Sequence, residues 1–354
     1  MAYKELTNTA ILLLKTLIET PSFSSEENET AKHIETWFKH YKIDYKRTKN
    51  NVWATNKYFD KSKPTLLLNS HHDTVKPNSA YTKNPFKAIV ENGKLYGLGS
   101  NDAGGCLVSL MATFAYFYNK EDLKYNLIIV ASAEEESSGP DGLNSMLEII
   151  PKVDVAIVGE PTLMHLAVAE KGLVVFDAEV SGTPSHAAHP NKNNAIYNTI
   201  EVLQWFKDFK FEKGSEALGD VKLTVTQINA GKQHNVVPAN VKLVVDVRVN
   251  DAYSNTEIAE ILKDKAPCKM TPRSLRLNSS SIPVNHDLVK SGIAIGRTTY
   301  GSPTLSDQAV LSCPSLKLGP GDSTRSHSAD EFIYINEIEE GIKIYIELLN
   351  KVIL

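Results

Sequence analysis

Several apolar runs along this chain end abruptly in polar or charged residues. Four have the length of strands: "TLLLNS" (65–70), "NLIIVAS" (126–132), "VDVAIVG" (153–159) and "SLKLG" (315–319). Helical patterns lie between them, notably over 104–118, where apolar side chains recur at helical spacing. Continuous apolar strands that alternate with helices predict an α/β fold, with a mostly parallel sheet flanked by helices.

The middle of the chain has a different pattern. Apolar and polar residues alternate there, as in strands with one solvent-facing side, over 172–182, 221–231 and 240–250. Helical patterns near 195–209 and 255–264 separate these strands. The sequence therefore predicts an α/β domain of residues 1–173 and 283–354, interrupted by a small α+β domain of residues 174–282.

Composition excludes several classes of protein. The chain has 354 residues and a net charge of −4, so it lacks the basic excess of a nucleic-acid-binding protein. The apolar run 10–14 near the N-terminus is interrupted by Lys15 and Glu19, which predicts an amphipathic helix and no membrane partner. Three scattered cysteines fit the reducing cytoplasm, where we expect the protein to act.

Acidic and histidine residues gather where the predicted strands end. In open α/β sheets, ligands bind beyond the carboxyl ends of the strands. The residues at or near these ends are His71, His72, Asp73, Asp102, Glu134, Glu135, Glu136, Glu160 and His327. Because this set mixes neutral nitrogen and anionic oxygen donors, it favours zinc or a similar divalent ion.

The run of three glutamates, 134–136, is the least expected of these features. Taken alone, such a triplet is typical of a solvated turn. If two Zn²⁺ ions are held by three carboxylates and two histidines, however, one positive charge remains, which one hydroxide would neutralise. A further carboxylate could then accept the proton of the attacking water, so the triplet can supply both a ligand and a general base.

Two glycine-rich stretches look like nucleotide-binding motifs and are rejected. In "GLGSND", Asp102 stands where a dinucleotide fingerprint requires its third glycine. In "GSNDAGGC", Gly105 and Cys106 replace the Lys and Ser or Thr of a phosphate-binding loop.

An ordered set of blocks resembles one enzyme family. The blocks are "SHHDTV", "LYGLGSNDAGG", "ASAEEESSG", "VGEPT", "VSGTPSHAAHP", "QHNVVPANVKLVVDVR" and "GPGDSTRSHSADEF". They are similar to those of the dinuclear-zinc amidohydrolases and peptidases that include acetylornithine deacetylase, succinyl-diaminopimelate desuccinylase, aminoacylase and carboxypeptidase G. The resemblance implies a zinc-exopeptidase-like catalytic domain with an inserted lid and dimerisation domain.

The resemblance also implies roles for single residues. It makes Asp73 the carboxylate that orients the ring of His71, Asp102 the bridge between two metals, and Glu135 the general base. It implies a cis peptide after Asp102. The five implied metal ligands are His71, Asp102, Glu136, Glu160 and His327. The expected cofactors are two divalent ions, zinc first, with cobalt or manganese as substitutes.

Four further residues match the family, three of them in the inserted segment and the fourth, Lys171, just before it. His186 would reach the active site of the partner subunit in a homodimer and stabilise the oxyanion; the alternative is a loop histidine with its hydrogen bonds satisfied locally. Asn235, Arg248 and Lys171 would bind polar groups of the substrate. Arg248 could instead pair with Asp246 or Asp251.

The function that the resemblance implies is hydrolysis of a linear amide. We expect a cytoplasmic enzyme that removes the acyl group of a small N-acyl-L-amino acid, of the N-acetyl- or N-succinyl-ornithine, -citrulline or -lysine type, in arginine or lysine biosynthesis. The alternatives are a succinyl-diaminopimelate desuccinylase, a dipeptidase or carboxypeptidase of the same family, a single-metal exopeptidase, and a non-catalytic binding relative.

Overall fold

The chain divides into two compact units. A computed structural model describes residues 3–354. The larger unit consists of Met1–Val168, Ser281–Tyr300 and Ser306–Leu354, and the smaller unit of Ala169–Ser280 and Gly301–Leu305. The sequence pattern assigns Gly301–Leu305 to the larger unit. In the structure this segment packs in the smaller one, since Gly301 lies so close to Ala217 that a Cβ atom would collide with its carbonyl oxygen.

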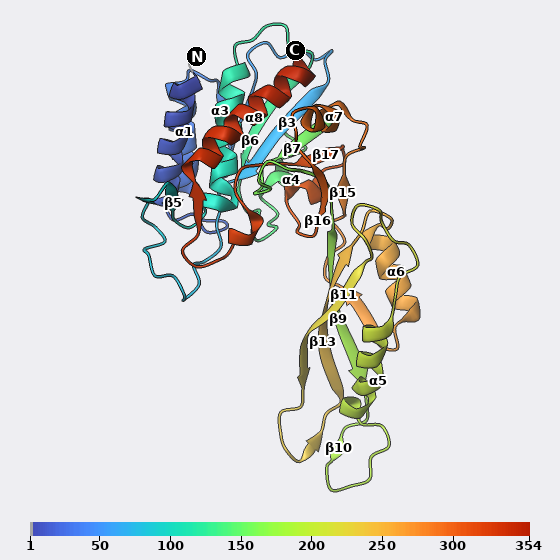
Figure 1. Cartoon of the computed structure of the whole chain (residues 1–354). Helices are drawn as coiled ribbons and strands as arrows, with labels where there is room; N and C mark the ends of the chain where they lie inside the picture. The colour runs from blue at the N-terminus through green and yellow to red at the C-terminus, as the bar shows by residue number, and fades with distance from the viewer. Residues whose placement is uncertain (1–2) are drawn as a thin grey trace. The chain divides into compact units, whose positions relative to one another are not determined.

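A nine-stranded sheet forms the centre of the larger unit, in the order β1-β2-β6-β3-β7-β17-β8-β15, with β16 also paired to β8 (Figure 1). Its central strands β6, β3, β7 and β17 run parallel, while β1, β2 and β8 are antiparallel to their neighbours. The strands are β1 (Tyr45–Thr48), β2 (Asn51–Thr55), β3 (Thr65–His71), β6 (Asn126–Ser132), β7 (Val155–Val158), β8 (Leu166–Glu170), β15 (Ser280–Ser281), β16 (Thr299–Ser302) and β17 (Ser315–Lys317). The four predicted strands are the four parallel ones, and the predicted α/β fold class is confirmed.

Helices cover the sheet because both faces of its central strands are apolar. Every residue of β3 and β6 is buried. Helix α3 packs against both strands and against α1 and α8, as the ribbon shows (Figure 1). The helices are α1 (Tyr3–Ile18), α2 (Asn28–His40), α3 (Gly105–Phe117), α4 (Leu143–Met146), α7 (Asp287–Ala294) and α8 (Ile335–Ile353). No helix within residues 3–354 is long and apolar enough to cross a membrane.

A small antiparallel sheet and several short turns complete the larger unit. The sheet contains β4 (Ile89–Glu91), β5 (Lys94–Tyr96) and β18 (Phe332–Tyr334), in the order β18-β5-β4. A kinked turn, η1 (Ser100–Gly104), precedes α3, and two 3-10 turns follow later in the chain, η2 (Asp307–Val310) and η3 (Ser323–Arg325). These turns place side chains beside the carboxyl ends of the central strands.

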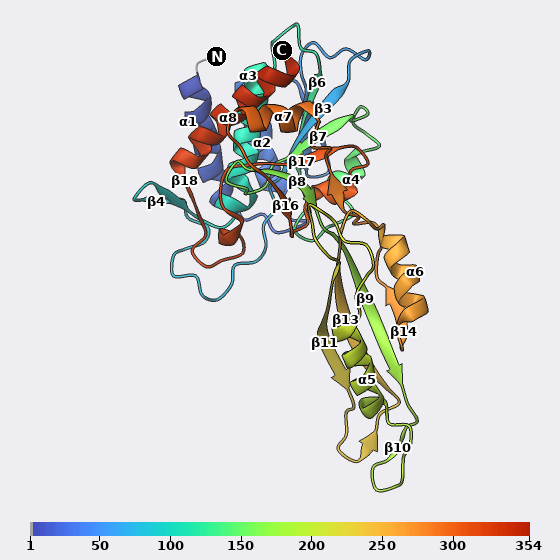
Figure 2. The ribbon, with the colours of Figure 1, turned by 45° about the vertical axis from the view of Figure 1, so that its right-hand side comes forward.

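The smaller unit is a four-stranded antiparallel sheet, in the order β11-β13-β9-β14, with α5 and α6 packed on one face (Figure 2). Alternate residues of β9 and β13 are buried against the helices, as the alternating pattern predicts. The elements are β9 (Gly172–Ser181), β10 (Ser185–His186), α5 (Ala195–Asp208), β11 (Lys222–Ala230), β12 (Val236–Val237), β13 (Asn240–Val249), α6 (Asn255–Lys265) and β14 (Lys269–Pro272).

Candidate metal centre

Six of the predicted residues converge at the carboxyl end of the central sheet. His71 is the last residue of β3, and the other five lie in the loops and turns beside it. Nitrogen and oxygen atoms of His71, Asp102 and Glu136 lie within 4.8 Å of one another, and so do those of His71, Glu135 and Glu160. His327 completes the cluster, with Nε2 3.0 Å from Oε2 of Glu136.

Asp102 lies between the two histidines. Its Oδ1 is 3.3 Å from Nε2 of His71, and its Oδ2 is 3.7 Å from Nε2 of His327. One carboxylate thus presents one oxygen to each half of the cluster. This is the arrangement that a carboxylate bridging two metal ions requires.

The ring of His71 is held so that Nε2 faces the other ligands. Its Nδ1 lies 3.0 Å from the carbonyl oxygen of Asp73 and 3.3 Å from Oδ1 of the same residue. A hydrogen bond at one ring nitrogen fixes the orientation of the other, as is usual for metal-bound histidines. His72 points elsewhere, since its ring nitrogens contact the hydroxyl of Thr30 and the carbonyl oxygen of Asn50.

The carboxylate of Asp73 also organises the glutamate triplet. Its Oδ1 accepts the backbone N–H of Glu135, and its Oδ2 accepts that of Glu136, both at 3.1 Å. The hydroxyl of Ser24 donates to Oδ2 at 2.7 Å. The buried residue Asp73 therefore positions His71, Glu135 and Glu136 at the same time.

Glu134 has a different task from its two neighbours. Its φ angle is 55°, a left-handed conformation that sends its side chain away from the cluster. There its carboxylate accepts hydrogen bonds from the Ser25 hydroxyl and the Asp141 backbone N–H. The triplet is thus neither a solvated turn nor three equivalent ligands, because Glu134 shapes the turn that presents the other two.

The turn that carries Asp102 is fixed by a residue that the sequence analysis did not single out. The peptide between Asp102 and Ala103 is cis, as the resemblance implies. The buried carboxylate of Glu331 accepts the backbone N–H groups of Gly99, Asn101 and Asp102, at 3.2, 2.8 and 2.9 Å. In the sequence, the only indication of this role is that Glu331 lies in "SADEF", shortly after the last implied ligand, His327.

A second residue missed from the sequence is Asp307. It lies in η2 and is buried, with Oδ2 accepting the hydroxyl of Ser132 at 2.6 Å. Ser132 ends β6, directly before the acidic run. Asp307 therefore stabilises the end of β6, which leads into Glu135 and Glu136. None of the sequence blocks quoted above contains Asp307.

Burial and the neighbouring carboxylates shift the pKa values of several groups in the cluster. Burial raises the pKa of Glu135 well above its usual value, and the charges of Glu160, Asp307 and Glu136 add to this. Burial, with the charge of Asp102, raises the pKa of Glu160 to about 8. The hydrogen bond with Glu136 raises the pKa of His327 to about 9. All three shifts favour the protonated form of the group, as an excess of neighbouring carboxylates does.

The residues present fit a pair of divalent cations. Four carboxyl side chains gather here, each at most 13% exposed, and buried carboxylates are costly unless cations compensate them. The five predicted ligands offer imidazole nitrogens and carboxylate oxygens, a donor set suited to zinc and similar ions. His71, Asp102 and Glu160 could hold one ion, and Asp102, Glu136 and His327 the other.

The four predicted residues of the smaller unit are not gathered into one cluster by that unit. His186 is exposed in β10, which pairs with β12, and the backbone carbonyl of Asn235 accepts the N–H of Ala187. Arg248 donates two hydrogen bonds to Asp246, at 2.8 and 3.0 Å, which is one of the alternatives given above. Lys171 donates to the carbonyl oxygen of Asp220 at 2.6 Å.

Solved structures similar to this chain include two metallopeptidases. One is a metallo-carboxypeptidase of the M20 family from Sulfolobus solfataricus (TM-score 0.76, 18% identity, 97% of this chain and 98% of the other covered). Another is a dinuclear metal-binding peptidase of the M20 family from Bacillus subtilis (TM-score 0.76, 16% identity, 98% of each chain covered). At these identities the likeness concerns the fold.

Sequence relatives and a family model identify the enzyme family as well as the fold. A succinyl-diaminopimelate desuccinylase of Rickettsia bellii is 28% identical, with 95% of each chain covered, and a second desuccinylase, from a Ruegeria species, is 23% identical over 94% of this chain and 92% of its own. The model of peptidase family M20/M25/M40 matches residues 67–351, which include every residue of the cluster. The chain is therefore a metal-dependent hydrolase of peptidase family M20/M25/M40.

Proposed function

We propose that this protein hydrolyses the linear amide of a small N-acyl-L-amino acid, with Glu135 as general base beside two divalent ions, zinc first. One observation carries the proposal: Glu135 lies next to the predicted ligands, 4.0 Å from Nε2 of His71, but is not needed among the five that complete the two metal sites. A carboxylate in this position is free to move a proton.

The residues of the chain then have distinct tasks. When bound, the two ions would supply a water of lowered pKa and would polarise the acyl carbonyl. Glu135 accepts the proton of the attacking water and delivers it to the leaving amine. Asp73 fixes the backbone of Glu135 through the 3.1 Å hydrogen bond, and this preorganises the Glu135 carboxylate for proton transfer.

Two substrate classes remain within this reaction. The block "GPGDSTRSH" and the compact length favour N-acetyl- or N-succinyl-ornithine, -citrulline or -lysine, and thus a role in arginine or lysine biosynthesis. The desuccinylase names of the relatives favour N-succinyl-diaminopimelate. Both are N-acyl amino acids with a free carboxylate, which Asn235, Arg248 or Lys171 would bind.

The test is amine release by the purified protein loaded with zinc, cobalt or manganese. The panel holds N-acetyl- and N-succinyl-ornithine, -citrulline and -lysine, N-succinyl-diaminopimelate and several dipeptides. Glu135→Gln is the negative control, and Glu148→Gln, in the loop after α4, is the matched variant that should stay active. We expect turnover of one acyl-amino acid, reduced about 10²- to 10⁴-fold in Glu135→Gln with its metal retained. Near-normal turnover in Glu135→Gln would refute the assignment of the base.

We also propose that the smaller unit forms a homodimer in which His186 serves the partner's site. Strand β11 is an edge of its sheet, and unpaired edges readily pair with another chain. Helix α5 exposes three large apolar side chains, Ile196, Tyr197 and Ile200, at 44%, 69% and 66%. Equilibrium sedimentation should show a dimer that Tyr197→Glu with Ile200→Glu dissociates. A monomeric wild type with full activity would refute the role of His186 in trans.

A further inference from the structure

The smaller unit contains a pocket that is separate from the residues assigned so far. It has a volume of about 660 Å³ and lies at the end of the β11–β13 ladder, next to the loop 231–235. Its walls combine two lysines, three carboxamides and a few apolar groups. The polar members are Asn229, Lys232, Gln233, Asn240 and Lys242.

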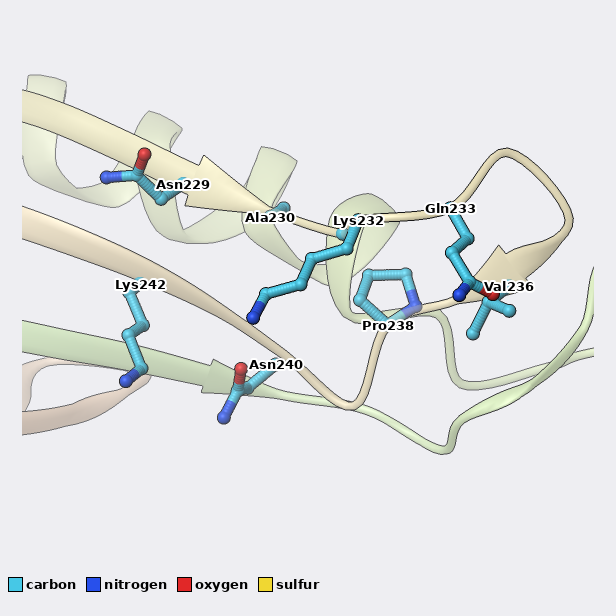
Figure 3. A pocket seen from close by; sticks show the side chains of 9 residues that line it. Asn229, Ala230, Lys232, Gln233, Val236, Pro238, Asn240 and Lys242 are labelled. Atoms are coloured by element: carbon cyan, nitrogen blue, oxygen red, sulfur yellow. The ribbon is translucent and has the colours of Figure 1, made fainter.

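The two lysines are the distinctive feature of this pocket. In Figure 3 the side chains of Lys232, Asn240 and Lys242 extend to the same side of the strands. Within residues 3–354, neither Lys232 nor Lys242 has an ion pair or a side-chain hydrogen bond, and no acidic residue lines the pocket. Two ammonium groups in a pocket whose wall contains no acidic residue form a site for an anion.

The acidic side chains near the pocket are only partly available to neutralise these lysines. Glu179 on β9 lies opposite Lys242 in the sheet register, and Lys269 on β14 flanks it on the other side. One oxygen of Glu179 accepts a hydrogen bond from Asn240 at 3.3 Å. Asp177, two residues before Glu179 on β9, also interacts electrostatically with Lys242, but it is paired with Arg273 at 2.8 Å. The four cations Lys232, Lys242, Lys269 and Arg273 outnumber these two carboxylates, so a net positive charge remains.

The walls also indicate the shape of the anion. Val236, Pro238 and Ala230 supply apolar surface beside the lysines. Methylene groups can pack on such a surface, while a terminal carboxylate accepts hydrogen bonds from ammonium and carboxamide groups. The pocket therefore matches a short aliphatic chain that ends in a carboxylate, such as a succinyl group.

The position of the pocket connects it with the proposed reaction. Gln233 and Val236, which line it, flank Asn235 in the chain, and Val236 is the strand partner of His186. We propose that Lys232 and Lys242 bind the carboxylate of the acyl group and make the enzyme selective for N-succinyl over N-acetyl substrates. This inference rests on the proposed function, since it names the acyl group that is removed.

Binding of succinate to the metal-loaded protein tests the pocket without turnover. Isothermal titration should show that Lys232→Gln and Lys242→Gln each weaken succinate binding about tenfold, as expected for loss of a charged hydrogen bond. Lys263→Gln, an exposed lysine of α6, is the matched control and should bind like the wild type. Equal affinity in all four proteins would overturn the proposal.

Turnover of paired substrates then identifies which carboxylate the pocket takes. For N-succinyl- and N-acetyl-ornithine, the two pocket variants should lower kcat/KM for the succinyl substrate about tenfold and leave the acetyl substrate unchanged. An equal loss for both substrates would overturn the acyl assignment and indicate the carboxylate of the amino acid. If no acyl-amino acid is turned over although succinate binds through the two lysines, the proposed function fails and the anion site stands. If turnover occurs but the lysines have no effect, the pocket proposal fails and the function stands.

Discussion

The two units of this protein hold their predicted functional residues in very different ways. In the larger unit, the ligand side chains lie at the ends of buried strands, and backbone N–H groups and buried carboxylates fix the loops that carry them. In the smaller unit, His186 is exposed and Arg248 is occupied by Asp246. The same ordered set of sequence blocks predicted both groups, yet only the first is assembled within one unit.

This difference shows where the chemistry is preorganised. A cluster of buried carboxylates needs a scaffold that prevents it from rearranging, and Asp73 and Glu331 provide one through five hydrogen bonds to backbone N–H groups. Exposed side chains that meet only a substrate or a partner need no such scaffold. Variants of the larger unit should therefore have the larger effects.

The largest effect should come from the carboxylate between the two histidines. Asp102→Asn removes a negative charge that faces both halves of the cluster, so both metal sites should weaken. We expect activity to fall roughly 10³-fold or more, because a bound metal contributes several kcal/mol to such a reaction. His327→Ala should weaken one site only. Metal content by plasma emission compares the two, and an equal loss in both variants would contradict a bridging role.

The next effect concerns the scaffold itself. Glu331→Gln keeps only part of the acceptor capacity for the three N–H groups, and Glu331→Ala keeps none. Since groups that orient metal ligands typically contribute 10- to 100-fold, we expect losses of about that size in metal affinity and kcat, with little change in KM. Glu337→Gln is unsuitable as a control, since Glu337 binds Arg325. The exposed Glu339→Gln should behave like the wild type. A rise in KM alone would contradict a positioning role for Glu331.

A smaller effect should appear as a pH dependence of stability. The folded pKa of Glu160 is about 8, against an ordinary value of 4.5, so the folded chain binds this proton more tightly than the unfolded chain. The resulting stabilisation is complete below about pH 4.5 and is lost as the pH rises through about 8. Chelator-treated protein should therefore lose roughly 1–3 kcal/mol of unfolding free energy over this range. Denaturant titrations at several pH values give the unfolding free energy, and in Glu160→Gln this free energy should depend less on pH. An unchanged pH dependence in Glu160→Gln would contradict the prediction.

The smallest effect is expected in the other unit. Arg248 and Asp246 are partly exposed, at 33% and 25% of their side chains, so their ion pair should contribute at most about 1 kcal/mol to stability. If Arg248 also binds the substrate carboxylate, Arg248→Ala should raise KM about tenfold without unfolding the protein. Asp246→Asn should preserve KM. If KM rises in Asp246→Asn but not in Arg248→Ala, Arg248 does not bind the substrate carboxylate and the prediction is wrong.

Most of the fold could be predicted from the sequence because its strands are either continuously apolar or strictly alternating. The predicted helix over 195–209 is α5, Ala195–Asp208, and the predicted strand over 126–132 is β6 to the residue. The short strands were missed, since β10, β12 and β15 have two residues each and no periodicity of their own. Their pairing depends on tertiary contacts that no local pattern encodes.

The candidate site divides in the same way. The ligand residues could be predicted because they belong to motifs at strand ends. Glu331 and Asp307 could not, since they act by accepting hydrogen bonds from residues far away in the chain, Glu331 from Asp102 and Asp307 from Ser132. The separate task of Glu134 was also invisible, because only its left-handed backbone distinguishes it from its two neighbours.

The most direct test of this account is to count and locate the metal ions in the purified protein. Plasma emission combined with anomalous diffraction from zinc-loaded crystals should give two ions per chain. One should lie beside His71 and Glu160, the other beside Glu136 and His327, with Asp102 in contact with both. A single ion, or two ions bound away from this cluster, would contradict the central claim that the strand ends of the larger unit form a dinuclear metal centre.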